Sequence, residues 1–135
     1  MTVRNVAEIA SFHAHVYFDG EQQADAARAL REAVAARFAV RLGTWRDAPV
    51  GPHPRAMYQI AFAPDLFGSI VPWLMLNHGA LSILVHPNTG DERRDHLDDR
   101  IWIGAALPLD ETALTEAPTE PEPAGEINTA PSLRP

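Results

Sequence analysis

The segment from Phe12 to Phe18 constrains the fold more than any other part of the chain. Its residues read Phe-His-Ala-His-Val-Tyr-Phe, so apolar and polar side chains alternate. Successive side chains of a β-strand point to opposite faces of a sheet. One face of this strand is therefore apolar, and the other carries His13, His15 and Tyr17. We expect helices to cover the apolar face, which leaves the histidines on the open face.

A helix is predicted directly after this strand, over residues 21–38. The segment is rich in alanine and contains neither glycine nor proline, which favours a helix. Its apolar residues recur at helical spacing and form one stripe, made of Ala27, Leu30, Val34 and Phe38. Asp19 stands where it can cap the start of this helix.

The remaining elements complete a recognisable order. Further strands are predicted at 40–45, 55–62 and 81–86, a helix at 64–77, and a short last strand at 100–104. The order β-α-β-β-α-β with an extra C-terminal strand is that of an α+β, ferredoxin-like fold. Such a fold has an antiparallel sheet with helices on one face. Its open face needs cover, and a second copy in a homodimer is the expected cover.

Three other segments give more local expectations. The helix at 64–77 is expected in one or two pieces, because Ser69 can cap a second piece with Pro72 in its first turn. Residues 47–54 contain three prolines and are expected to form a stiff loop. Residues 91–99 are charged and are expected to be solvent-exposed.

The chain divides by composition into a domain and a tail. A length of 135 residues suits one domain, and we assign it to residues 1–109. Residues 110–135 are acidic and proline-rich, with few large apolar side chains. Little apolar surface is available there to offset the entropy cost of ordering, so we expect a disordered tail.

Charge and cysteine content exclude several classes of protein. The formal net charge is −7 and there is no basic run, so no nucleic-acid partner is expected. No apolar stretch approaches the length of a membrane helix, and residues 1–10 lack the apolar core of a secretory signal, so a cytoplasmic location is expected. The chain has no cysteine, so any metal must be held by nitrogen and oxygen.

Three histidines are predicted to meet at one end of the sheet. His13 and His15 share a face of the first strand, and His86 ends the fourth strand with suitable parity. In a ferredoxin-like sheet these two strands are antiparallel neighbours, which brings the three imidazoles together as candidate metal ligands. The alternative is that the pair is merely polar and that His86 only opens a turn.

The other histidines leave more than one interpretation open. His53 lies in a rigid Gly-Pro-His-Pro loop and is either a positioned functional residue or an exposed one. The topology places it toward the other end of the first strand, so it would join the cluster across a dimer or not at all. His96 is a site candidate or a surface residue. His78, at a helix end, is expected to be structural.

Several motifs together resemble the DOPA 4,5-dioxygenase family, in order from about residue 11 to residue 109. They are Phe-His-Ala-His-Val-Tyr-Phe-Asp at 12–19, Gly-Pro-His-Pro at 51–54 with Met-Tyr-Gln at 57–59, Pro-Trp-Leu-Met-Leu-Asn at 72–77, Leu-Val-His-Pro-Asn-Thr-Gly-Asp at 84–91, and Asp-His at 95–96. In place of the family's more usual Asn-Arg-Gly, residues 77–79 read Asn-His-Gly.

The resemblance implies a ferredoxin-like fold, a homodimer and extradiol cleavage of a catechol by Fe(II) and O2. In the named fungal enzyme the catechol is DOPA, opened between carbons 4 and 5. Zinc or another divalent metal is an alternative occupant of the site. Fe(II) is usually held by two histidines and a carboxylate.

The resemblance and the residue chemistry together give each candidate a role. His15 and His86 are expected to be metal ligands with His13 third, or the set is completed by His53 or by a carboxylate from elsewhere in the chain. His53 and His96 are the candidate catalytic acid and base. The substrate-binding candidates are Arg55, Arg94 and Tyr17, the arginines because either can hold a substrate carboxylate.

Three other functions compete with the enzyme. One is a non-catalytic ferredoxin-like dimer that binds a metal or a small aromatic ligand. Another is an interaction dimer with its histidines packed in the interface. The third is a hydrolytic zinc enzyme, whose ligands would look alike in sequence.

Overall fold

A five-stranded antiparallel sheet forms the centre of the computed structural model, which describes residues 1–135. Its strands are β1 (Ser11–Phe18), β2 (Arg41–Leu42), β3 (Ala56–Phe62), β4 (Ser82–Asn88) and β5 (Ile101–Ile103). They lie in the order β2-β3-β1-β4-β5, and every neighbouring pair is antiparallel. The predicted α+β fold with its β-α-β-β-α-β order is therefore confirmed.

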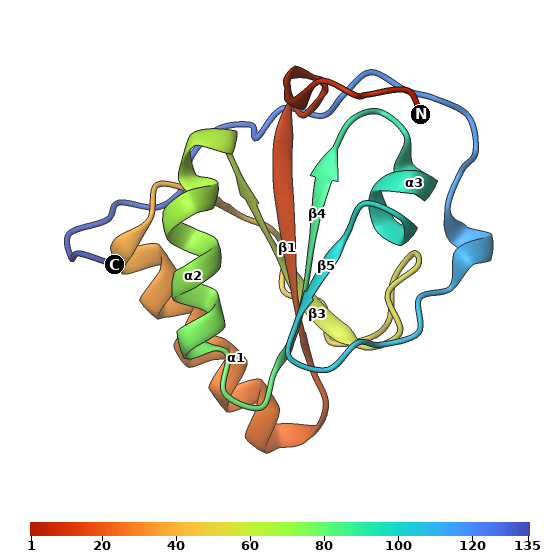
Figure 1. Ribbon diagram of the computed structural model, residues 1–135. Coiled ribbons are helices and arrows are strands. Elements are labelled where there is room, and N and C mark those ends of the chain that lie inside the picture. Colours follow the sequence, from red (N-terminus) through yellow and green to blue (C-terminus); the bar gives the residue numbers. More distant parts are fainter.

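The helices divide between the two faces of the sheet. The two long helices, α1 (Gly20–Arg37) and α2 (Phe67–Asn77), lie on one side, and the short α3 (Glu92–Leu97) lies on the other (Figure 1). Single 3-10 turns occur at Val6–Glu8, Pro64–Leu66 and Glu111–Ala113. None of the helices combines the length and the apolar composition that a membrane span requires.

The main core lies between the sheet and the two long helices. It contains 18 buried residues, among them the apolar members of β1 and the stripe of α1, as the alternation and the helical spacing predicted. On the opposite face Tyr17, Met57 and Leu84 form a separate small cluster. The polar face of β1 is thus left free of the main core.

The helix predicted at 64–77 in one or two pieces forms as the 3-10 turn Pro64–Leu66 followed by α2, but the expected cap at Ser69 is wrong. The hydroxyl of Ser69 donates to the carbonyl of Leu66 instead of capping a new helix, and Pro72 lies inside α2. Proline lacks the N–H that would bond within the helix. The helix continues through it because Ile70, Val71 and Leu74 are buried in the core.

Two strands differ in length from the expectation. The strand predicted at 40–45 shortens to Arg41–Leu42, with a single further bridge between Arg46 and Met57. β4 extends two residues beyond the predicted end because Asn88 and Pro87 pair with the start of β1. This extension carries the chain past His86 toward α3.

The charged segment at 91–99 was expected to be solvent-exposed, but part of it is buried. It forms α3, in which Asp95 and His96 are buried. The carboxylate of Asp91 caps the helix by accepting from the N–H of Arg94. The carboxylate of Asp95 accepts from the N–H and the hydroxyl of Thr89, at 2.8 and 2.6 Å. These bonds fold the segment back onto the end of β4.

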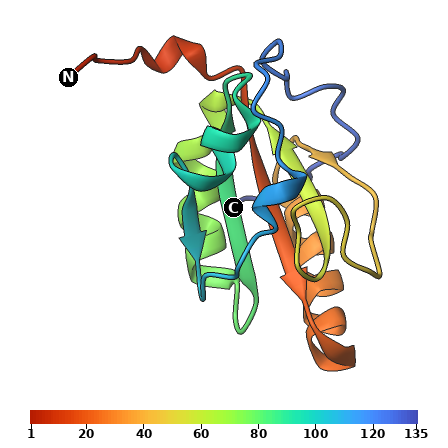
Figure 2. The same ribbon diagram turned by 90° about the vertical axis from the view of Figure 1, so that its right-hand side faces the viewer.

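Residues 110–135, called the C-terminal segment below, contain one 3-10 turn and no strand or longer helix. The segment follows the body of the protein, with Leu114 buried and backbone hydrogen bonds from Asn128 to Val40 and from Ser132 to Ala36. Figure 2 shows its first part passing over the face that carries α3. Its disorder, and the division at residue 109, stay predictions.

Candidate metal centre

Five histidines gather on the sheet face opposite α1 and α2. They are His13 and His15 from β1, His86 from β4, His53 from the loop before β3, and His96 from α3. Each is less than 9% exposed. The sixth, His78, lies apart at the end of α2, where its Nδ1 is 3.0 Å from the carbonyl oxygen of Leu81. We call the first five the histidine cluster.

The pairing of β1 with β4 builds the first part of the cluster. His13 lies directly opposite His86 in the antiparallel register. Their ring centroids are 5.1 Å apart, and His15 is also 5.1 Å from His86. The Nε2 atoms of His15 and His86 are separated by only 3.0 Å. The topology therefore brings together the three histidines predicted to meet.

His53 joins the cluster within the same chain, contrary to the expectation from topology. Its loop does start beyond Tyr17, at the far end of β1, but then folds back over the open face. The ring centroid of His53 lies 4.2 Å from that of His15. Its Nδ1 is 2.6 Å from the hydroxyl oxygen of Tyr17. A turn between Val50 and His53 fixes this return of the loop.

His96 closes the cluster from α3. Its ring centroid lies 3.9 Å from that of His86 and 6.2 Å from that of His15. The alternative of a surface residue is wrong, because the helix packs against β4 with this side chain inward.

Backbone carbonyls fix the tautomers of two of these imidazoles. The Nδ1 of His86 is 2.8 Å from the carbonyl oxygen of Pro87, and that of His96 is 2.7 Å from the carbonyl oxygen of Glu92. A carbonyl only accepts, so each Nδ1 carries the hydrogen and donates it. Each Nε2 then has a free lone pair, which is the arrangement usual in metal-binding histidines.

Burial keeps the cluster neutral near pH 7. Burial first, and then repulsion from neighbouring histidines, lower the pKa of His13 and of His53 to about 4. The pKa values of His15 and His86 lie well below the ordinary 6.5 for the same reasons, and burial also lowers that of His96. Neutral imidazole is the form that binds a metal.

Two nitrogen atoms in the cluster have no partner inside the protein. They are Nε2 of His13 and Nδ1 of His15, both buried and without a hydrogen bond. Native proteins rarely leave buried polar atoms unpaired, so each such atom calls for an explanation. A metal ion would be a partner for a lone pair on Nε2 of His13.

The spacing of the nitrogens also fits a metal ion. Two overlapping triplets have donor atoms within 4.8 Å of one another, His13 with His15 and His86, and His15 with His53 and His96. Two nitrogens each about 2.1 Å from one ion lie about 3.0 Å apart when they subtend a right angle. This matches the 3.0 Å between His15 and His86. The residues present fit a divalent metal with nitrogen ligands.

A polar pocket of about 350 Å³ opens next to the cluster. Its wall includes four of the histidines and no hydrophobic residue, and the acidic members are Glu92, Asp95, Glu120 and Glu122. Two of these carboxylates, Glu120 and Glu122, come from the C-terminal segment, which the motifs did not connect with the site.

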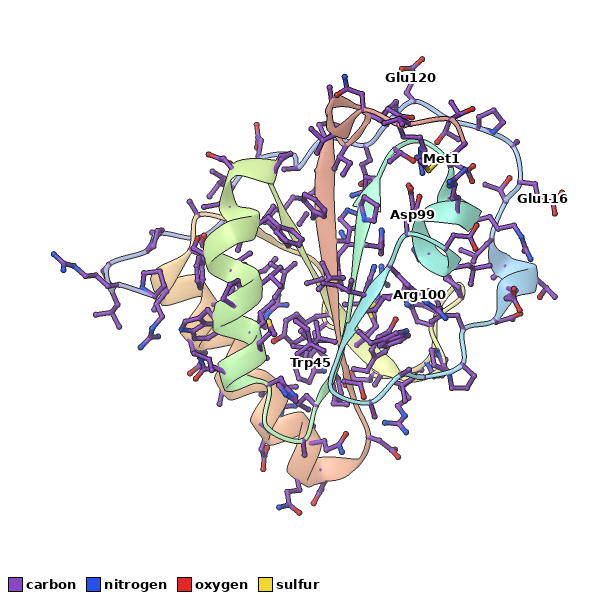
Figure 3. All side chains as sticks on the ribbon, in the orientation of Figure 1. Met1, Trp45, Asp99, Arg100, Glu116 and Glu120 are labelled. Carbon is purple, nitrogen blue, oxygen red and sulfur yellow. The ribbon has the colours of Figure 1, made fainter.

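The two arginines expected to bind substrate lie elsewhere. Arg55 lines a separate hollow with Asp19 and Asp47, and the Nε of Arg94 forms an ion pair with Asp99 at 3.1 Å. Arg100, labelled in Figure 3, lies beside the cluster, and its guanidinium donates to the carbonyl oxygen of His96 at 3.1 Å. Sequence reasoning missed Arg100 because it directly precedes β5 and carries no local motif.

Comparison with known proteins identifies the family. Residues 12–113 match the Dopa 4,5-dioxygenase family. A crystal structure of a protein from Nostoc punctiforme, described as a "putative dioxygenase", is similar with a TM-score of 0.80 and 53% identity. That similarity covers 82% of this chain and 96% of the other.

Two curated relatives are similar over 111 residues each. The chain is 42% identical to an "Uncharacterized 21.2 kDa protein" of Botryotinia fuckeliana, over 74% of this chain and 61% of the relative. It is 41% identical to a DOPA 4,5-dioxygenase of Amanita muscaria, over 76% and 49%. The matched region thus spans about half to three fifths of these relatives. The chain belongs to the Dopa 4,5-dioxygenase family.

Proposed function

We propose that this protein is an extradiol dioxygenase that opens the ring of a catechol with O2 at an Fe(II) ion held by His13, His15 and His86. The observation that carries the proposal is the buried, neutral histidine cluster with unpaired nitrogens beside an open pocket. The family supports the reaction class. The relative from Amanita muscaria is named DOPA 4,5-dioxygenase, so DOPA is the first catechol to test.

The proposed ligands are prepared by the protein itself. The bond from His86 Nδ1 to the carbonyl of Pro87 orients its Nε2 toward His15. His13 and His15 are fixed by the strand, since neighbouring strands pair along the whole of β1. Bound there, Fe(II) with open positions would supply the redox chemistry that joins O2 to the ring.

His96 and His53 are the proposed base and acid. Because Nδ1 of His96 donates to Glu92, its Nε2 is free to accept the proton of a catechol hydroxyl. Burial raises the pKa of Tyr17 above its ordinary value, so this hydroxyl keeps its hydrogen and can donate it to Nδ1 of His53. His53 then carries its own hydrogen on Nε2 and can donate a hydrogen bond, and its ring centroid lies 4.2 Å from that of His15.

The experiment reconstitutes the protein with Fe(II) without air and then adds L-DOPA, caffeate or protocatechuate in air. We expect oxygen uptake and a yellow ring-opened product with the wild type, and neither with His15→Ala or His86→Ala. His78→Ala is the matched control, because this histidine lies outside the cluster, and it should retain turnover.

The outcomes separate the proposed enzyme from its alternatives. Bound metal without product from any catechol would favour the non-catalytic binding protein. Absence of both metal and product would contradict the metal centre and favour an interaction dimer. The homodimer itself is part of the proposal and is tested by light scattering of the purified chain.

A further inference from the structure

The C-terminal segment forms one wall of the pocket beside the histidine cluster. The residues that it contributes to this wall are Thr115, Thr119, Glu120 and Glu122. They lie beyond residue 113, where the match to the family ends. What this wall selects is therefore a property of this chain that the family match does not assign.

Hydrogen bonds hold this wall in place at both ends. The N–H of Thr119 donates to the carbonyl of Gly90 at 2.8 Å. At the other end the hydroxyl of Ser11 donates to the backbone carbonyl of Glu122, and the side-chain amide of Asn88 donates to the Ser11 oxygen at 2.9 Å. Ser11 and Asn88 are paired residues of β1 and β4, so the backbone of Glu122 is fixed to the sheet.

The pocket wall carries acidic side chains but no basic one. Four of its residues are aspartate or glutamate, and none is lysine or arginine. Its histidines are neutral near pH 7, because burial lowers the pKa of each. Arg41 and Arg100 lie near enough to lower the pKa of His13 and of His96, but neither arginine lines the pocket. The side chain of a substrate in this pocket therefore meets negative charge.

Glu122 offers the carboxylate of this wall that is free to meet a ligand. The two acidic residues of α3, Glu92 and Asp95, already accept hydrogen bonds within the protein. Figure 3 shows Glu120 pointing away from the body of the protein. The carboxylate of Glu122 accepts no hydrogen bond from the protein, and its side chain is 57% exposed.

The same carboxylate borders the histidine cluster. Its Oε2 lies 3.7 Å from Nε2 of His13. This nitrogen is buried and has no hydrogen-bond partner, and His13 lines the same pocket at 6% exposure. An unpartnered buried nitrogen indicates that the pocket takes a polar ligand. A ligand that reaches this nitrogen also comes close to the Glu122 carboxylate.

We propose that the pocket selects catechols whose side chain carries a positive charge and that Glu122 is the residue that selects them, an inference that rests on the proposed function. A carboxylate stabilises an ammonium group through a charge-assisted hydrogen bond, and it disfavours a second carboxylate placed beside it. No arginine in the wall compensates for that repulsion. A catechol with an amine side chain is thus favoured over one with a carboxylate side chain of similar length.

The test compares three catechols that differ in the charge at the end of a short side chain. Dopamine is cationic, 4-ethylcatechol is neutral and 3,4-dihydroxyphenylpropionate is anionic. Their affinities for the Fe(II)-loaded protein are measured by calorimetry without air, and kcat/KM is measured from oxygen uptake in air. We expect the wild type to favour dopamine and to disfavour the propionate, with a preference that shrinks as salt is added.

Two variants assign the preference to one residue. Glu122→Gln is compared with Glu116→Gln, the matched control, which removes the same charge from the same segment but outside the pocket wall. We expect Glu122→Gln to weaken dopamine binding roughly 2–5-fold and to strengthen propionate binding by a similar factor, the range for a partly exposed charge pair. The affinity for 4-ethylcatechol should not change, and Glu116→Gln should match the wild type with all three ligands.

The other outcomes overturn defined parts of the proposal. Equal affinity of the wild type for the three catechols, or a preference for the propionate, would overturn the selection and leave the proposed function intact. An equal loss for all three in Glu122→Gln would show that Glu122 supports the site without distinguishing charge. The same shift in Glu116→Gln would assign the preference to overall surface charge. Neither binding nor turnover of any catechol, including the neutral one, would contradict the proposed function itself.

Discussion

The pair formed by Tyr17 and His53 shows how single residues prepare the site. Both side chains are buried, and the 2.6 Å contact between the Tyr17 hydroxyl and Nδ1 of His53 fixes the ring of a residue that comes from a loop. A loop histidine without such a partner would be free to turn about its side-chain torsions. Tyr17 is held by β1, and its hydroxyl in turn fixes the orientation of His53 in the loop.

Tyr17→Phe tests this positioning role. The variant loses one buried hydrogen bond, so we expect it to unfold about 1–2 kcal/mol more easily. Metal binding should persist, and kcat for ring cleavage should fall by about 10–100-fold, as for other partners that orient site residues. Steady-state oxygen uptake and thermal melting provide the two measurements.

Tyr58→Phe is the matched control for this comparison. Tyr58 is equally buried, and its hydroxyl donates to the carbonyl of Ala27 at 3.0 Å on the opposite face of the sheet. It should show a similar loss of stability with unchanged kcat. Equal losses of kcat in both variants would show that Tyr17 acts only through stability.

The parts of the site that sequence could predict are those encoded by strand periodicity. His13, His15 and His86 follow from the parity of two strands and from their adjacency in the fold. His53 and His96 do not, because a loop that folds back and a helix that packs inward depend on contacts between distant residues. For α3 one local signal existed, since Asp91 stands where a helix cap is expected.

At the scale of elements, the packing of α3 against β4 places His96 in the cluster. This packing depends on Asp95, which is 2% exposed and accepts two hydrogen bonds from Thr89. Asp95→Ala would leave the partly buried N–H and hydroxyl of Thr89 without these partners. We expect a loss of about 1–3 kcal/mol in unfolding free energy and faster hydrogen exchange in α3.

Asp98→Ala serves as the control for this prediction. Asp98 lies at the C-cap of the same helix and is exposed. Its removal should change stability by less than about 0.5 kcal/mol. If both variants left hydrogen exchange in α3 unchanged, the bonds from Thr89 would not be what holds the helix.

Pro72 destabilises α2 locally, and burial of the apolar side chains of this helix compensates for the loss. The side chain of Pro72 is exposed, whereas Val71 and Leu74 are buried. Pro72→Ala restores a backbone donor inside the helix, so we expect the protein to gain about 1–3 kcal/mol of stability. Chemical denaturation measures the gain.

Pro64→Ala provides the comparison for that gain. Pro64 is the first residue of the 3-10 turn before α2, a position where proline costs little. Its replacement should bring no stabilisation. A gain of the same size in both variants would mean that Pro72 does not strain the helix.

At the scale of the whole molecule, the buried histidines make stability depend on pH. For His13 and His53 the pKa is about 4 in the folded protein, below the ordinary 6.5 expected when unfolded. The unfolded chain therefore binds more protons between these values, and stability falls as the pH falls through this window. Each such histidine contributes a loss of roughly 2 kcal/mol between pH 7.5 and pH 5.

We therefore expect the metal-free protein to melt at least about 8 °C lower at pH 5 than at pH 7.5. Differential scanning calorimetry across this range makes the measurement. Replacing His53 by Gln should reduce the slope, because one titrating group is removed. A melting temperature independent of pH between 7.5 and 5 would contradict the buried, neutral state of the cluster.

The order of the strands and long helices was easier to predict from sequence than the path of the C-terminal segment. Alternation in β1 and the apolar stripe of α1 are local patterns, and their order along the chain restricts the topology to a few choices. The C-terminal segment has no periodicity, and its contacts with Val40 and Gly90 are a few hydrogen bonds between residues distant in sequence. Composition alone therefore gave no sign that part of it lines the pocket.

The absence of sulfur from the cluster has a consequence for metal supply. Imidazole nitrogens bind iron, nickel, copper and zinc, and affinity rises from Fe²⁺ to Cu²⁺ in any site of this type. At equal concentrations of free metal, copper or zinc would therefore displace iron from a centre made of His13, His15 and His86. The metal that occupies the centre would depend on which metal ions are available in the cell. Correct loading would then be a property of the cell's metal buffering, and protein made in a zinc-rich medium would emerge in an inactive form.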